Sequence, residues 1–221
     1  MGFTYFGVQN VECDYRGTDV REKPGLLEFN VHCTHLTFPV ELSLEGIHYV
    51  SDALAAVAVG IEMGVNPAKI QEGLSMFQNM AGRQELLSVG GYTIIKDCYN
   101  AGPESMSAAL TVLGNKPGRR VAVLGDMLEL GVCTQAEHYR VGRIAAEKAD
   151  LVLAYGPNSS RIVSGAVTGG MSESRAKGFE NRDEMVAAMK RMIKPGDVVL
   201  VKGSRGMHME LVLEQFLKED T

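Results

Sequence analysis

The stretch RRVAVLGD, residues 119–126, decides the fold class of this chain. Its apolar run, VAVL, does not alternate with polar residues, which is typical of a strand buried on both faces of a parallel sheet. A glycine and an aspartate end the run. The segment TQAEHYRVGRIAAEKA, residues 134–149, follows with the apolar spacing of a helix. The sequence therefore predicts a buried strand that leads into a helix.

The same alternation continues on both sides of this stretch, from residue 86 to the C-terminus. Strands are predicted at 92–97, 119–126, 149–156, 177–180 and 197–203, and helices at 103–113, 134–149, 158–167, 182–193 and 208–217. Strands that alternate with helices of this length predict an α/β fold with a Rossmann-like, doubly wound, mostly parallel sheet. We place the start of this domain at Gly82, so that it spans residues 82–221.

Residues 1–81 have a different character. Extended segments at 4–9, 26–31 and 36–42, separated by Pro and Gly, predict a small set of antiparallel strands. Two helices are expected after them, at 47–63 and 67–77, and Pro67 suits the first turn of the second helix.

Composition narrows the class of protein. The chain has 221 residues, 45% hydrophobic and 22% charged, with a net charge of −5 and no basic stripe, so we expect a soluble protein without a nucleic-acid partner. The longest apolar stretch, residues 54–65, is too short to span a bilayer, and the N-terminus does not resemble a signal peptide. Four cysteines without a CxxC pair indicate free thiols in a reducing cytoplasm.

Polar residues and glycines follow the predicted strands. Asp97 ends one strand, Gly125 and Asp126 end the next, and Lys202, Gly203 and Ser204 end the last. The carboxyl ends of parallel strands share one edge, where open α/β sheets bind ligands. Every strand also needs a turn, and turns use Gly and Asp, so both explanations stay open.

Asp97 is the first candidate for a ligand contact at this edge. A carboxylate accepts hydrogen bonds and repels phosphate, so the hydroxyl groups of a ribose are suitable partners. Glu104, in the first turn of the following helix, makes that helix start a poor phosphate site. The alternative is that Asp97 and Glu104 cap a turn and a helix, and the residues alone favour neither.

Three further segments carry polar residues. The loop KGSRGMHME, residues 202–210, offers Lys202, Arg205 and backbone N–H groups to a carboxylate or phosphate. In GDMLELG, residues 125–131, we expect a surface turn with Leu128 and Leu130 in the core. In HCTH, residues 32–35, strand alternation separates the side chains, so we expect no metal site.

Known phosphate-binding and catalytic motifs are absent from the sequence. There is no GxxxxGK[ST], GxGxxG, HExxH or GxSxG. If the protein uses ATP, another segment must hold the phosphates.

Five segments, in this order and spacing, resemble the Mur ligases: GIHYVSDALAA at 46–56, GRQE at 82–85, KDCYNAGPESM at 96–106, VLGDMLELG at 123–131 and KGSRGMHME at 202–210. The resemblance implies a three-domain enzyme that joins an amino acid or dipeptide to a UDP-muramoyl-peptide, using ATP and Mg²⁺ through an acyl phosphate. Residues 1–81 would be the last part of its central domain and 82–221 its complete C-terminal domain.

The branch that the segments resemble most adds D-Ala-D-Ala to a UDP-N-acetylmuramoyl-tripeptide in peptidoglycan precursor synthesis. The P-loop and the metal ligands of that family lie in a part that this chain does not include. The resemblance therefore implies that ATP and Mg²⁺ are held mainly elsewhere, and that residues 1–221 alone are inactive.

The resemblance also implies roles for single residues. On the nucleotide side, Arg83 would approach the phosphates, Asp97 would bind the ribose, and Tyr99 and Asn100 would lie near them. His48 and Asp52 would lie on the adenine side. Lys202, Ser204 and Arg205 would lie near the incoming substrate. Tyr49 and Asp52 stand where the family has asparagines, and Lys96, Cys98 and Gly102 also depart from its pattern. Since aspartate only accepts hydrogen bonds, we expect a weaker adenine contact at Asp52.

Two alternatives remain. One is a Mur-type ligase for another amino acid, such as diaminopimelate or glutamate, although the D-N-P-R stretch expected of the diaminopimelate enzymes is absent. The other is a non-catalytic, flavodoxin-like module that binds a nucleotide.

Overall fold

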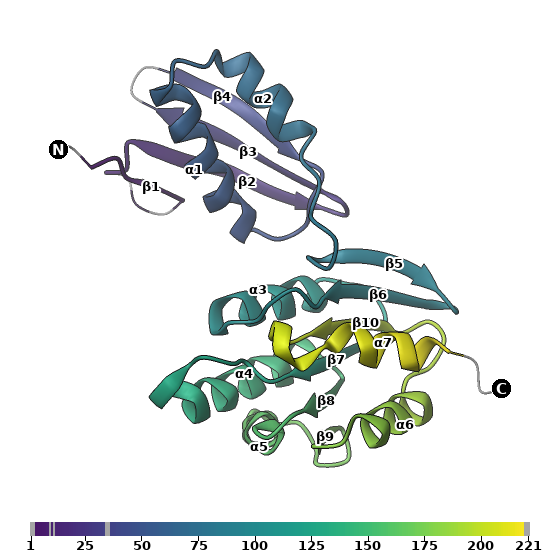
Figure 1. Ribbon diagram of the computed structural model, residues 1–221. Coiled ribbons are helices and arrows are strands. Elements are labelled where there is room, and N and C mark those ends of the chain that lie inside the picture. Colours follow the sequence, from purple (N-terminus) through teal and green to yellow (C-terminus); the bar gives the residue numbers. More distant parts are fainter. Residues whose placement is uncertain (1–2, 9, 11, 34–35, 219–221) are drawn as a thin grey trace. The chain divides into compact units, whose positions relative to one another are not determined.

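The computed structural model describes residues 3–8, 10, 12–33 and 36–218 (Figure 1). The chain forms two compact units, Met1–Asn79 and Met80–Thr221, so the division lies close to the boundary predicted at Gly82. Of the helices in these described ranges, none combines the length and the apolar character that crossing a membrane needs.

The N-terminal unit is a small sheet covered on one face by two helices. Its strands are β1 (Phe6–Gly7), β2 (Tyr15–Lys23), β3 (Leu26–Cys33) and β4 (Leu36–Leu42), and its helices are α1 (His48–Glu62) and α2 (Pro67–Ser75). Strands β2, β3 and β4 are antiparallel, as expected, whereas β1 pairs with β2 in parallel. Alternate residues of β3 are buried with the apolar face of α1, which explains the two-residue period of this strand.

Strand β2 was not predicted from the sequence. Its residues, YRGTDVREK, are mostly polar because only one end of the strand is buried on the helix side. A bulge between Thr18 and Arg21 interrupts its pairing, and Asp19 adopts a left-handed conformation there (φ 52°).

The C-terminal unit confirms the predicted Rossmann-like, mostly parallel sheet. Its described strands are β5 (Glu85–Val89), β6 (Tyr92–Asp97), β7 (Arg120–Gly125), β8 (Leu151–Tyr155), β9 (Ala176–Phe179) and β10 (Val198–Lys202), in the spatial order β5-β6-β10-β7-β8-β9. All neighbouring pairs are parallel except β5–β6, a hairpin closed by Gly90 and Gly91. Strand β5 was not predicted, since this exposed edge strand lacks the continuous apolar run of its neighbours.

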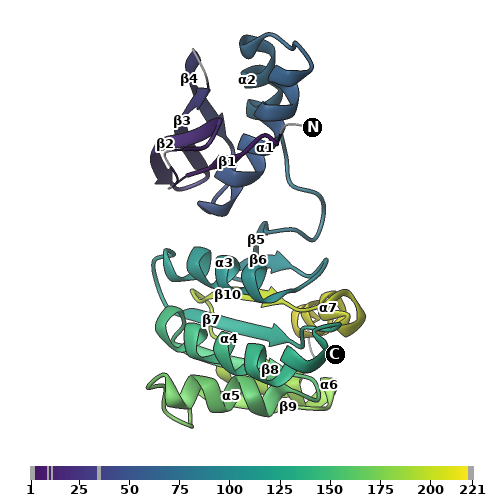
Figure 2. The same cartoon turned by 90° about the vertical axis from the view of Figure 1, so that its left-hand side faces the viewer.

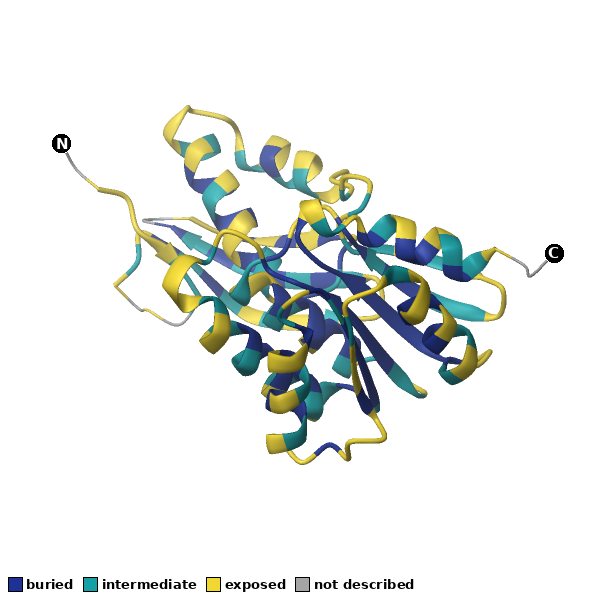
Figure 3. Ribbon diagram, turned by 60° about the horizontal axis from the view of Figure 1, so that its bottom comes forward, coloured by how far each residue is buried: buried dark blue, intermediate teal, exposed yellow. Residues whose placement is uncertain are grey.

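Helices cover both faces of this sheet (Figure 2). Helices α3 (Pro103–Gly114), α4 (Thr134–Lys148) and α5 (Ser159–Thr168) pack on one face, and α6 (Arg182–Met192) and α7 (Met209–Leu217) pack on the other. The central strands are therefore buried on both sides and appear dark blue in Figure 3. The uninterrupted apolar runs of the sequence follow from this double burial.

The order of the strands creates a switch point at β10. This strand lies between β6 and β7, and its chain continues to α7 on one face, whereas β6 and β7 continue to α3 and α4 on the other. The loops at the carboxyl ends of β6, β10 and β7 therefore diverge, and such a divergence is where doubly wound sheets form their ligand crevice.

Candidate functional site

Two glycines face each other at the carboxyl ends of β7 and β10, which lie side by side in the sheet. A Cβ atom added to Gly203 would lie 3.0 Å from the Cα atom of Gly125 and 2.7 Å from the Cγ atom of Met209. A larger residue at either glycine would separate the two strand ends. The glycines thus allow the ends of these two neighbouring strands to approach closely.

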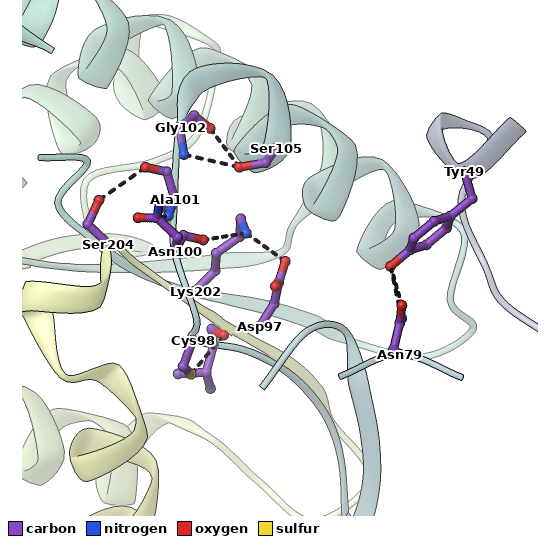
Figure 4. Close-up of polar contacts among 11 residues, drawn as sticks. Tyr49, Asn79, Asp97, Cys98, Asn100, Ala101, Gly102, Ser105, Lys202 and Ser204 are labelled. Carbon is purple, nitrogen blue, oxygen red and sulfur yellow. Dashed lines mark hydrogen bonds and ion pairs between the residues drawn. The ribbon is translucent and has the colours of Figure 1, made fainter. Parts of the chain in front are cut away.

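Asp97 and Lys202 form a buried ion pair at this point (Figure 4). The Lys202 Nζ atom donates to the Asp97 Oδ2 atom at 2.7 Å and to the carbonyl oxygen of Asn100 at 3.0 Å. Among the described residues, no hydrogen bond reaches Asp97 Oδ1, and 11% of the Asp97 side chain stays exposed. Lys202 is thus occupied within the protein, and Asp97 offers one oxygen to a ligand.

Ser204 joins three loops. Its hydroxyl donates to the carbonyl oxygen of Ala101 at 3.0 Å and accepts from the backbone N–H of Leu128 at 2.9 Å, and its own N–H donates to the carbonyl oxygen of Asp126. The hydroxyl proton is therefore committed to the protein. Ser204 therefore lies at the predicted edge, but it is buried there and connects the loops to one another.

A pocket of about 320 Å³ opens beside Ser204. It is lined by Tyr99, Asn100, Ala101, Leu128, Glu129, Ser204, Arg205 and Gly206, and we call it the rim pocket. The Arg205 side chain is 66% exposed and lies 3.6 Å from a Glu210 oxygen, which is a loose ion pair. Arg205, unlike Lys202, is therefore available to an anionic group in the pocket.

Arg83 and Tyr99 contact each other on the same edge. The Arg83 guanidinium lies 4.4 Å from the centre of the Tyr99 ring, and the Tyr99 N–H donates to the carbonyl oxygen of Gly82 at 3.1 Å. This cation–π contact holds an exposed cation next to the end of β6.

His48 and Asp52 lie on α1 in the N-terminal unit. The Tyr49 hydroxyl forms a hydrogen bond with the Asn79 side chain (Figure 4). The His48 ring packs on the Tyr49 ring with 4.3 Å between their centroids, and Asp52 is exposed. The hydroxyl group of Tyr49 is thus used in a hydrogen bond with Asn79.

Cys98 follows Asp97 but faces the core. Burial, followed by the nearby charge of Glu210, raises the pKa of its thiol to about 12. The thiol donates to the carbonyl oxygen of Val201 at 3.4 Å, so it is a structural group.

The interpretation of residues 125–131 was wrong for Leu128. Met127 is buried and fills the core, whereas Leu128 is 43% exposed and lines the rim pocket. The reason is the backbone: Glu129 (φ 64°) and Gly131 (φ 54°) are left-handed, which turns the chain outward, and the sequence carries no clear signal for this at Glu129.

Sequence reasoning placed Asp126 at the expected edge but assigned no role at the site to it or to His138, and both side chains are buried behind this loop. The histidine stands twelve residues after Asp126, the end of the predicted strand, and looks isolated in the sequence. Only the packing of α4 brings its ring to the loop.

Metal ligands are not clustered in the described part of the chain, where no group of three or more His, Cys, Asp and Glu side chains is arranged to hold an ion. His32 contacts the hydroxyls of Thr18 and Thr37, and Cys33 is buried on the opposite face. Thr34 and His35, the rest of the HCTH segment, lie outside the described residues. A separate, open groove of about 640 Å³ lies between α5 and β9, away from the predicted site residues.

Comparison with known families identifies the class of protein that this fold and edge define. Residues 82–205 match the family described as "Mur ligase, glutamate ligase domain". The chain belongs to the Mur ligase family, as the sequence motifs predicted.

Its relatives point to one branch. The chain is 32% identical to the UDP-N-acetylmuramoyl-tripeptide–D-alanyl-D-alanine ligase of Escherichia coli (strain K12), over 98% of this chain and 47% of that protein. It is 32% identical to the ligase of the same name from Bacillus subtilis (strain 168), over 93% and 45%. The chain thus spans about half the length of these relatives.

Solved structures agree. MurF from Acinetobacter baumannii matches with a TM-score of 0.85 and 31% identity, over 97% of this chain and 46% of that one. MurF ligase from Thermotoga maritima in complex with ADP matches with a TM-score of 0.80 and 26% identity, over 98% and 48%.

Proposed function

We propose that this chain is the C-terminal portion of an ATP-dependent ligase that adds D-Ala-D-Ala to a UDP-N-acetylmuramoyl-tripeptide for peptidoglycan synthesis. The observation that carries the proposal is its 32% identity, over almost its whole length, to ligases of that name. Residues 1–81 are then the last part of the central domain, and 82–221 the C-terminal domain. We infer that the enzyme acts in the cytoplasm, which its four free cysteines support.

The nucleotide side of the proposal uses the end of β6. Asp97 Oδ1, left open by the Lys202 contact, accepts a ribose hydroxyl, and the amide of the exposed Asn100 adds a polar contact. Arg83, held on the Tyr99 ring, approaches the phosphates. The relative solved with ADP supports a nucleotide in this family. Phosphates and Mg²⁺ are held mainly by the half that these 221 residues do not include.

The substrate side of the proposal uses the rim pocket. Arg205 pairs with the dipeptide carboxylate, because it is the exposed cation of its loop, whereas Lys202 and Ser204 support the pocket from behind. Positioning the amine against an acyl phosphate then accelerates the reaction by proximity and by neutralising charge.

A chimera tests this function. Residues 1–221 are joined to the complementary N-terminal half of the Bacillus subtilis ligase, and phosphate release is measured with UDP-muramoyl-tripeptide, ATP and Mg²⁺. We expect release that depends on D-Ala-D-Ala and not on diaminopimelate or glutamate. Arg205→Ala should raise the KM for the dipeptide about tenfold or more, because a charged hydrogen bond is lost.

The matched control is Arg161→Ala, an exposed arginine on α5 outside the pocket lining, which should leave the KM unchanged. Release with another amine in place of the dipeptide would replace the proposed substrate. A folded chimera that binds ADP without turnover would favour a non-catalytic module.

A further inference from the structure

The loop that forms one wall of the rim pocket is held from behind by buried polar groups. Asp126, at the start of this loop, accepts from the backbone N–H of Asn158 at 3.1 Å and from its side-chain amide at 2.7 Å. Gly156 makes room for this carboxylate, because a Cβ atom there would lie 2.7 Å from Asp126 Cγ. The carboxylate is thereby fixed between the ends of β7 and β8.

His138, from α4, holds the next residue of the loop. Its side chain is fully buried; Nδ1 lies 2.6 Å from the carbonyl oxygen of Thr134, and the backbone N–H of Met127 points at Nε2 from 2.9 Å. A carbonyl only accepts and an amide N–H only donates, so Nδ1 carries the proton and Nε2 is the acceptor. Asp126 Oδ1, 3.7 Å from Nε2, is too far away for a hydrogen bond.

Two consecutive backbone amides of the loop are therefore each bound by a buried side chain. Met127 N–H is held by His138, and Leu128 N–H is held by the Ser204 hydroxyl. Directly after these amides, the loop presents exposed Leu128 and left-handed Glu129 to the rim pocket. A solvated surface turn needs no such support, because water satisfies its amides.

We propose that His138 is a positioning residue for the rim pocket. By accepting the Met127 N–H, its Nε2 atom fixes the wall that Leu128 and Glu129 form, and this fixed wall sets the affinity for the molecule bound there. With D-Ala-D-Ala as that molecule, the inference rests on the proposed function. The apolar Leu128 side chain then contacts a methyl group, and the Glu129 carboxylate faces the ammonium group of the dipeptide.

Two substitutions distinguish the hydrogen bond that Nε2 accepts from the one that Nδ1 donates. In His138→Gln, the side-chain oxygen lies near the position of Nε2 and keeps the acceptor for Met127. In His138→Asn, the amide lies near the position of Nδ1, keeps the donor for Thr134 and loses that acceptor. Both replace the ring by a smaller amide, so they share the cost of lost packing.

The experiment compares the 221-residue chain and both variants by NMR. Hydrogen exchange of the Met127 and Leu128 amides reports the loop, and titration with D-Ala-D-Ala reports the pocket. His138→Asn should speed exchange at Met127 about tenfold and weaken dipeptide binding about five- to tenfold, as expected for one lost hydrogen bond, whereas His138→Gln should stay near wild type.

Equal exchange at Met127 in the two variants would overturn the positioning role, whatever the dipeptide does. Faster exchange in His138→Asn with unchanged dipeptide affinity would also overturn it, because the wall would then not set affinity. If wild type binds no dipeptide, the substrate proposed for the rim pocket fails, and with it the role of His138 in dipeptide affinity. Exchange at Met127 still decides, independently of any ligand, whether His138 fixes the loop.

Discussion

Lys202→Met offers a sharp test of how the carboxyl edge is built. The lysine lies at the end of β10, and its Nζ atom sits 2.7 Å from Asp97 Oδ2. Methionine keeps the unbranched side chain and its packing but removes the cation. The Asp97 carboxylate then remains buried without a positive partner.

The structure sets the size of the effect. At 2.7 Å and an effective dielectric constant of about 20, two unit charges attract by about 6 kcal/mol. The mutation does not lose all of this, because 11% of the Asp97 side chain reaches water. Breaking a buried pair from one side costs about 3–5 kcal/mol, and we expect the lower half of that range.

The assay must report the C-terminal unit separately, because the chain has two units and need not unfold in one step. Hydrogen exchange of amides in β6 and β10 measures the free energy of opening of this unit, and far-UV circular dichroism in urea gives the global transition. Lys177→Met, the same substitution at an exposed lysine on β9, is the matched control and should change stability by less than about 0.5 kcal/mol.

A double-mutant cycle completes the test. Adding Asp97→Asn to Lys202→Met removes the unpaired charge, so the double variant should be less destabilised than the sum of the two single variants by about 2 kcal/mol or more. If Lys202→Met costs under about 1 kcal/mol, or the two effects simply add, the two groups do not form a desolvated pair and the reasoning fails.

Two further predictions concern titration. Because burial raises the pKa of Cys98 to about 12, iodoacetamide at pH 8 should alkylate the exposed Cys133 and spare Cys98 in the folded chain; comparable labelling of both, read by mass spectrometry, would contradict this burial. The Arg120 guanidinium lowers the pKa of Asp150 below its ordinary 3.8, so this carboxylate stabilises the fold above that pH and loses its contribution as pH falls through the lowered value. Asp150→Asn should therefore flatten the acid limb of a stability-against-pH curve, and an unchanged limb would refute the link.

Much of the fold could be predicted from the sequence, because it rests on local patterns. The apolar runs before Asp97, Gly125 and Tyr155 predicted buried parallel strands, and these strands are present. The strands that were missed, β2 and β5, are partly exposed, so their sequences need no continuous apolar run. The edge that collects the candidate residues also followed from the sequence, since parallel strands end on one side.

The state of each side chain at that edge was decided only by the tertiary structure. From the sequence, Lys202, Ser204 and Arg205 were equal candidates for contact with the incoming substrate. In the structure, Lys202 pairs with Asp97, and the Ser204 hydroxyl is hydrogen-bonded to Ala101 and Leu128. Of these three candidates, only Arg205 is exposed. These partners are 105, 103 and 76 residues apart in the chain. Periodicity reports which residues share a strand or helix face, because it arises from local backbone geometry. Which polar groups pair with each other depends on the order in which strands assemble, and β10 inserts between β6 and β7 only when the whole sheet has formed.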